Sequence, residues 1–147
     1  MTEKKQSPAF RILMLLYLNT QKYNENRNLP REERDPNVSF WVYPLDIAEE
    51  LNVDHGSVRK ALAGLRTLGI VRRHSDGMWG FDGGSTFDFL NKSSGEFTQA
   101  TLKEGLGVSQ PTASRKMSLL AELGLIEISR AESVPVTGGR RLWFKRA

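Results

Sequence analysis

The residues of this chain that suggest chemistry are cations and hydroxyl groups rather than nucleophiles or metal ligands. Residues 55–75 carry five basic residues and no acidic one. A second basic cluster lies at residues 140–146, RRLWFKR. Clusters of this kind favour contact with a polyanion, although most charged runs are solvated surface. The basic residues of the first cluster are Arg59, Lys60, Arg66, Arg72 and Arg73.

Other chemistries find little support. The chain has no cysteine and two histidines, His55 and His74, which cannot supply the usual ligand shell of a zinc ion. The glycine-rich segments 82–88 and 137–141 lack the spacing and the lysine of a phosphate-binding P-loop, and no Gly-x-Ser-x-Gly motif occurs. We therefore expect a protein that is not an enzyme and that uses no metal and no cofactor.

Length and hydrophobic patterning bound the class of protein. The chain has 147 residues, 39% of them hydrophobic and 26% charged, and a formal net charge of +4. These values are typical of one ordinary soluble domain or two small ones. The most apolar run, residues 12–18, is far shorter than the roughly 20 apolar residues that a membrane span needs. We expect a cytoplasmic, nucleoid-associated protein with no membrane contact.

An internal repeat organises the chain. Shifted by 55 positions, residues 47–71 align without a gap on residues 102–126. A turn and a terminal glycine match along with the apolar positions, so the similarity exceeds what two unrelated amphipathic helices would share. The positions that meet identical residues are Glu49, Leu51, Val53, Leu65, Leu68 and Gly69.

Each copy predicts a helix-turn-helix. A short helix over 45–51 or 100–106 leads into a tight turn, whose valine, Val53 or Val108, is expected to plug the core. The second helices begin at Asp54 and Ser109, residues that accept hydrogen bonds from free first-turn N–H groups, and Pro111 suits such a first turn. Their predicted buried stripes are Val58, Leu62 and Leu65 in the first copy and Ala113, Met117 and Leu120 in the second.

A hairpin follows each pair of helices. Gly69 and Gly124 are expected to end the second helices, and β-branched residues come next. Residues 70–81 predict a hairpin with Ser-Asp-Gly at its tip, and residues 126–146 predict a longer one whose loop contains Pro135, Gly138 and Gly139. Helix, turn, helix and hairpin form the winged helix-turn-helix arrangement. We predict a mostly α protein with small β-hairpin wings, an α+β fold of two tandem winged helix-turn-helix units.

Further elements precede each pair of helices. A first helix is predicted from Pro8 to about Lys22, followed by a polar loop and a strand over 39–43. The second unit is expected to open with the capping-box pattern 85-STFD-88, with Phe97 as its brief strand. Because Gly83-Gly84 makes a natural boundary, the predicted units are residues 1–84 and 85–147.

Aromatic residues gather on the predicted strands. They can stack on unpaired bases, but packing beneath a wing is the favoured interpretation. The residues are Phe40, Trp41, Tyr43, Trp79, Phe81, Trp143 and Phe144. The apolar face of the first helix is expected to be core or a homodimer seam, and it includes Phe10, Leu13, Leu16 and Tyr17.

Two stretches resemble known regulators. The segment 107-GVSQPTASRKMSLLAELGLI-126 resembles the helix-turn-helix of MarR-type and related winged-helix regulators. The segments 57-SVRKAL-62 and 69-GIV-71 resemble the corresponding part of GntR-type regulators. The resemblance is more specific for the fold than for either family. No effector domain of either family is evident, and a tandem pair departs from both.

The resemblance implies that the second helix of each unit enters the major groove of DNA. It places at base edges Asp54, His55, Ser57 and Arg59, and in the second copy Ser109, Gln110, Thr112 and Ser114. It places near phosphates Lys60, Arg115 and Lys116, and on the wings Arg72, Arg73, His74, Arg140 and Arg141. Asp54 is better explained as a helix cap, because a carboxylate repels phosphate.

We therefore predict a sequence-specific double-stranded DNA-binding protein, a transcriptional regulator that reads DNA with two recognition helices per chain. Plasmid and phage replication initiators, which bind origin repeats with paired winged helices, are one alternative. A winged-helix scaffold for protein partners, of the chromosome-segregation type, is another. Neutralising Arg59, Arg115 and Arg140 is expected to leave the function of such a scaffold intact.

Overall fold

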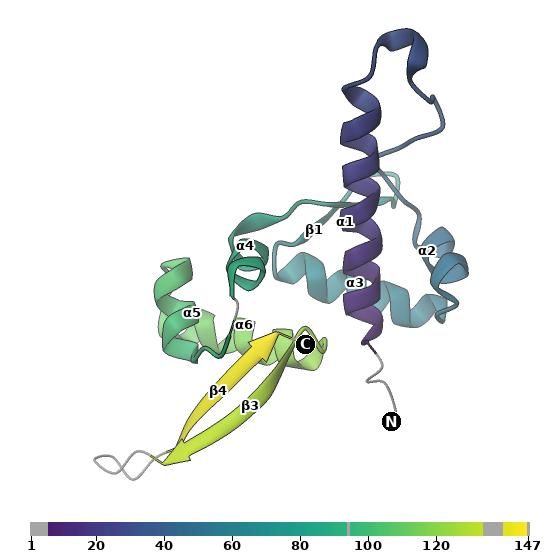
Figure 1. Cartoon of the computed structure of the whole chain (residues 1–147). Helices are drawn as coiled ribbons and strands as arrows, with labels where there is room; N and C mark the ends of the chain where they lie inside the picture. The colour runs from purple at the N-terminus through teal and green to yellow at the C-terminus, as the bar shows by residue number, and fades with distance from the viewer. Residues whose placement is uncertain (1–5, 94, 134–139, 147) are drawn as a thin grey trace, which may run out of the picture. The chain divides into compact units, whose positions relative to one another are not determined.

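The structure is a computed structural model of the chain, in which residues 6–93, 95–133 and 140–146 are described (Figure 1). Its described part is mostly helical, and its strands form two small antiparallel hairpins, which confirms the predicted fold class. No helix in these ranges is long and apolar enough to cross a membrane. The elements are α1 (Pro8–Arg27), η1 (Arg31–Glu33), α2 (Pro44–Leu51), α3 (His55–Thr67), β1 (Val71–Arg73), β2 (Trp79–Phe81), α4 (Gly84–Lys92), α5 (Gln99–Leu106), α6 (Gln110–Glu122), β3 (Ile126–Ser133) and β4 (Arg140–Arg146).

The chain divides into two compact units, which are described one at a time. The N-terminal unit is Pro8–Asp82, and the C-terminal unit comprises the described residues from Gly83 onward together with Gln6 and Ser7. In the N-terminal unit α2 and α3 lead into the β1–β2 hairpin, the N-terminal wing. In the C-terminal unit α5 and α6 lead into the β3–β4 hairpin, the C-terminal wing. Adding 55 to the bounds of α2 and α3 gives those of α5 and α6.

The turn between the two helices has the same backbone geometry in both units. Asn52 and Gly107 are left-handed, with φ of 51° and 63°. Glycine adopts this conformation freely, and asparagine tolerates it better than most residues do. Val53 and Val108 follow, and their N–H groups donate to carbonyls of the preceding helix at 3.0 and 3.2 Å. The valines are half-buried, so the predicted turn is present and its valine fills the core only in part.

The second helices begin at the predicted caps. A carboxylate oxygen of Asp54 accepts from the N–H of Ser57 at 3.1 Å. The hydroxyl of Ser109 accepts from the N–H of Thr112 at 3.4 Å. Each bond satisfies a backbone donor that the first helical turn leaves free. Pro111 lies in the first turn of α6, where its missing donor does no harm.

Left-handed glycines end both helices. Gly69 and Gly124 come one residue after the last residue with helical geometry and have φ of 78° and 73°. The N–H groups of Ile70 and Leu125 then donate to the carbonyls of residues 65 and 120 at 3.0 and 2.9 Å. This hydrogen-bond pattern closes a helix and sends the chain into a strand.

The buried stripes of the second helices are confirmed. Their six predicted residues are all 4% exposed or less, and five of the six are completely buried. In the N-terminal unit α1 lies across α3 (Figure 1). Leu13 and Leu16 of α1 are buried against it, whereas Phe10 and Tyr17 are half-buried. The face of α1 that includes these residues therefore belongs to the core of this unit.

The N-terminal wing is a short hairpin with a tight tip. Its strands pair Val71 with Phe81 and Arg73 with Trp79. The predicted Ser-Asp-Gly tip is present, and the N–H of Gly77 donates to the carbonyl of residue 74 at 2.9 Å. The C-terminal wing is longer, and its predicted loop residues Pro135, Gly138 and Gly139 lie outside the described part of the chain.

Each wing is extended by an isolated β-bridge to a segment that precedes it in the chain. Val42 forms a bridge with Trp79, and Phe97 forms one with Phe144. The strand expected over residues 39–43 is thus reduced to one bridge, and the brief strand expected at Phe97 is present as one. These bridges tie the segment before α2 or α5 to the wing of the same unit.

Two element boundaries were predicted incorrectly. Helix α1 runs to Arg27 rather than Lys22, because its last turn is tied to the following loop. The side-chain amide of Asn26 donates to the carbonyl of Asp35 at 2.9 Å and accepts from its N–H at 2.8 Å. The capping box at residues 85–88 is also wrong: α4 begins after Gly83, and no side chain caps it.

Candidate nucleic-acid interface

Helix α3 presents one polar stripe to solvent. His55, Arg59 and Ala63 follow one another at intervals of four residues, and Arg66 and Thr67 continue the stripe one turn further. All five residues are exposed, while the opposite face of α3 supplies the buried stripe. The helix is therefore amphipathic, and Arg59 and Arg66 lie on the same outward face.

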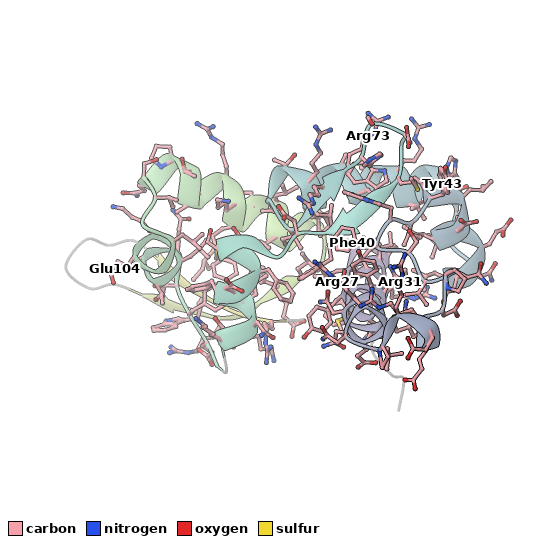
Figure 2. All side chains as sticks on the ribbon, turned by 90° about the horizontal axis from the view of Figure 1, so that it is seen from above. Arg27, Arg31, Phe40, Tyr43, Arg73 and Glu104 are labelled. Atoms are coloured by element: carbon pink, nitrogen blue, oxygen red, sulfur yellow. The ribbon has the colours of Figure 1, made fainter. Side chains whose placement is uncertain are left out.

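This stripe forms one wall of a groove. The groove has a volume of about 790 Å³, and the N-terminal wing supplies its other wall. We call it the arginine groove, after Arg59, Arg66 and Arg73. Figure 2 shows Arg73 at the outer edge of the wing, with Phe40 nearer to α1. The complete lining is Pro44, His55, Arg59, Ala63, Arg66, Thr67, Arg73, Gly77 and Trp79.

The arginine groove carries unbalanced positive charge. Its lining includes three arginines and no carboxylate. Within the part of the chain that the structure describes, Arg59, Arg66 and Arg73 form no ion pair. A guanidinium offers two parallel N–H donors that match the oxygens of a phosphate. The groove is thus suited to a phosphodiester backbone.

Strand alternation separates the two wing arginines that the sequence placed together. Arg73 lies on the groove side of β1, whereas Arg72 lies on the other side. The guanidinium of Arg72 is 5.5 Å from the ring centroid of Phe40 and 5.4 Å from that of Trp41. It also lies 3.9 Å from a carboxylate oxygen of Asp82. Arg72 is therefore engaged in packing the wing.

His74 lies on the same side of the wing as Arg72, away from the arginine groove. Its ring centroid lies 4.8 Å from that of Trp41. Its Nδ1 lies 3.4 Å from a carboxylate oxygen of Asp76. Of the predicted wing contacts in this unit, Arg73 alone lines the arginine groove.

The other predicted residues of α3 lie beside the groove. Ser57 and Lys60 are exposed but do not line it. Asp54 caps the helix, as expected. The predicted set omitted six residues that line the groove: Pro44, Ala63, Arg66, Thr67, Gly77 and Trp79. Arg66 belongs to the basic run and stands seven residues after Arg59, a helical spacing that could have identified it.

Helix α6 exposes a different set of groups. Gln110, Ser114 and Arg115 are exposed and available to a ligand. The hydroxyls of Ser109 and Thr112 are engaged with each other at 3.0 Å as part of the helix cap. Gln110, Ser114 and Arg115 therefore offer an amide, a hydroxyl and one guanidinium.

Lys116 points elsewhere than the predicted phosphate contact. Its ammonium donates to the hydroxyl of Thr86 on α4 at 3.1 Å, and Thr86 is only 1% exposed. Lys116 stands 55 positions after Ala61, which is 5% exposed in the N-terminal unit. The lysine thus takes a core position, and its amine satisfies a buried hydroxyl.

Two cations of the C-terminal wing, Arg130 and Lys145, are paired with acids. Arg130 donates to Glu96 at 2.7 Å and lies 4.5 Å from the ring centroid of Trp143. This hydrogen bond is the main reason that the pKa of Glu96 lies below its ordinary value. Lys145 lies 3.4 Å from a carboxylate oxygen of Glu127. Arg140 and Arg141 begin β4, and their side chains lie outside the described part of the structure.

No family model matches the chain, and no curated protein matches it either. The mRNA-binding domain of elongation factor SelB from E. coli, solved with SECIS RNA, is one similar structure. It has a TM-score of 0.28 and 16% identity over 88% of this chain and 97% of that one. A crystal structure of a Corynebacterium diphtheriae protein has a TM-score of 0.32 and 16% identity over 94% of this chain and 26% of that one. Likeness at these TM-scores supports no conclusion about the function of this chain.

Proposed function

We propose that this chain is a sequence-specific double-stranded DNA-binding protein that regulates transcription, with binding and not catalysis as its activity. The observation that carries the proposal is the arginine groove, whose three arginines have no carboxylate partner among the described residues. A positively charged groove beside an exposed helix suits a polyanion that also carries hydrogen-bonding groups which the side chains of the helix can recognise.

Double-stranded DNA meets both requirements. Its major groove admits an α-helix, and its phosphates run along both edges of that groove. With α3 in the major groove, one phosphodiester strand would pass between α3 and the N-terminal wing. Arg59, Arg66 and Arg73 would then contact that strand, and His55 would lie near the base edges at the start of the helix.

The C-terminal unit would add a second reading helix. Gln110 and Ser114 offer neutral hydrogen-bonding groups, and Arg115 offers a guanidinium. Because α3 and α6 differ in sequence, the proposed site is non-palindromic. Its two parts would lie about one helical turn, ~10 bp, apart.

Selection of bound duplexes from a random library tests this proposal. We expect a two-part motif, and tighter binding to that duplex than to single-stranded DNA or to a stem-loop RNA. Arg59→Ala should weaken duplex binding by one to two orders of magnitude, since a good contact to DNA is worth about 1–3 kcal/mol. An unenriched library would count against sequence-specific reading and favour a protein-docking role.

The genomic position of the selected motif separates regulator from replication initiator. Sites scattered across promoters, with altered transcription when the chain is removed, would support the regulator. Clustered direct repeats at an origin would support the initiator. Both roles use the same DNA contact, so the arginine groove is expected to be needed in either case.

A further inference from the structure

The repeat register allows the two units to be compared residue by residue at the proposed interface. His55, Arg59 and Arg66 of α3 stand where α6 has Gln110, Ser114 and Ala121. Arg73 of β1 stands where β3 has Ile128. Each cation of the arginine groove is thus replaced by a neutral residue in the C-terminal unit.

The equivalence is geometric as well as sequential. Arg73 pairs with Trp79 in the N-terminal wing, and Ile128 pairs with Phe144 in the C-terminal wing. Trp79 and Phe144 are in turn the residues that receive the bridges from Val42 and Phe97. Arg73 and Ile128 therefore occupy the same position in their wings.

The chemistry of the C-terminal face does not suit phosphate. Ser114 and Ala121 end in a hydroxyl and a methyl group, and Ile128 exposes 60% of its surface. Glu122, at the position of Thr67, is exposed and negatively charged. A phosphodiester strand on these residues would lose hydration without meeting a cation at any of the four equivalent positions, and it would be repelled by Glu122.

Three of the remaining described cations of this unit have other partners, whereas Arg146, at the end of β4, is exposed. Lys116 is bonded to Thr86, and Arg130 and Lys145 are paired with carboxylates. Arg115 is exposed, but it stands at the position of Lys60, which does not line the arginine groove.

We infer that this chain holds the nucleic-acid backbone in the arginine groove of its N-terminal unit, and that the equivalent face of the C-terminal unit, formed by the described residues of α6 and β3, holds no phosphodiester strand. The inference rests on the proposed function, because it divides the work of DNA binding between the two units. The C-terminal unit contacts base edges without holding the phosphodiester backbone. The salt dependence of binding comes from Arg59, Arg66 and Arg73.

An exchange of residues between equivalent positions tests the inference. In the first variant of the full chain, Arg59→Ser, Arg66→Ala and Arg73→Ile give the N-terminal unit the residues of the C-terminal unit. Each phosphate contact contributes a slope of about one to the plot of log affinity against log salt. We therefore expect the slope for a duplex of mixed sequence to fall by about three. Far-ultraviolet circular dichroism checks that the exposed substitutions leave the fold intact.

The second variant is the reciprocal one, with Ser114→Arg, Ala121→Arg and Ile128→Arg. It should raise the slope, because it creates a second groove of the same charge. Lys92→Ala, an exposed cation of α4 outside both second helices and both wings, is the control and should leave the slope unchanged. A slope that the first variant leaves unchanged, or that the second variant fails to raise, overturns the inference. If the wild-type chain shows no salt-dependent duplex binding, the proposed function itself fails, which is a different result.

Discussion

The two units share a backbone plan and differ in what anchors their wings. In the N-terminal unit, Phe40 lies between Tyr23 of α1 and the wing, directly on Gly80. In the C-terminal unit, a hydrogen-bonded ion pair between Arg130 and Glu96 joins the wing to the segment before α5. The difference shows that a helix-turn-helix is specified by short local signals that a repeat can copy. The attachment of its wing depends on distant residues that have diverged.

Equivalent core leucines provide the largest expected effect. Leu65 and Leu120 are both completely buried, so Leu65→Ala and Leu120→Ala should each destabilise the protein by about 2–5 kcal/mol. Because each leucine packs within its own unit, we expect each variant to lose hydrogen-exchange protection mainly there. Equal loss across both units in either variant would show that the units unfold together and would break the comparison.

The contact between Phe40 and Gly80 gives the next largest effect. A Cβ atom at Gly80 would clash with the ring of Phe40, so Gly80→Ala should cost about 1–3 kcal/mol through overpacking. The free energy of unfolding, measured in urea, tests this. Combining Gly80→Ala with Phe40→Leu should recover part of the loss. Additive losses would indicate that Phe40 does not anchor the wing.

The two helix caps should contribute by similar, smaller amounts. Asp54→Ala and Ser109→Ala each remove the acceptor of a first-turn N–H group, and each should cost about 1 kcal/mol. Asp54→Asn and Ser109→Thr retain an acceptor and serve as controls. If removing the cap of one unit leaves the free energy of unfolding unchanged, that cap no longer stabilises the second helix of its unit.

The ion pair of the C-terminal wing should have the smallest effect, visible mainly through pH. The Arg130 guanidinium holds the pKa of Glu96 below its ordinary value of 4.5. Because the folded-state pKa is the lower one, the stabilisation is present above the unfolded pKa and is lost as pH falls through the folded pKa. An NMR titration of the Glu96 carboxyl carbon should show a midpoint below 4.5 that rises in Arg130→Gln. An unchanged midpoint would contradict this assignment.

Sequence reasoning performed best where the signals are local. The caps at Asp54 and Ser109, the left-handed Gly69 and Gly124 and the tip ending in Gly77 all involve neighbours a few residues apart. It failed where distant residues decide. Helix α1 is extended by the bonds between Asn26 and Asp35, which no helical pattern reveals.

The candidate site shows the same division. Helical spacing is enough to place His55, Arg59 and Arg66 on one face of α3. It does not show that Arg73 completes a groove while Arg72 turns to Phe40 and Trp41, because that requires the pairing of the wing. Nor does it show that Lys116 points at buried Thr86. A lysine beside Arg115 suggests an exposed cation, whereas the equivalent residue 55 positions earlier is a buried alanine.

The amino-acid sequence by itself determined that this protein contains two helix-turn-helix units with hairpins, and that its basic residues fall near the second helices and the wings. Turns, caps and amphipathic periods are short-range, so each copy carries its own instructions. Only the tertiary structure decided which cations converge. Convergence depends on the wall that faces α3, and the bridge from Val42 and the ring of Phe40 fix that wall across long separations in the chain.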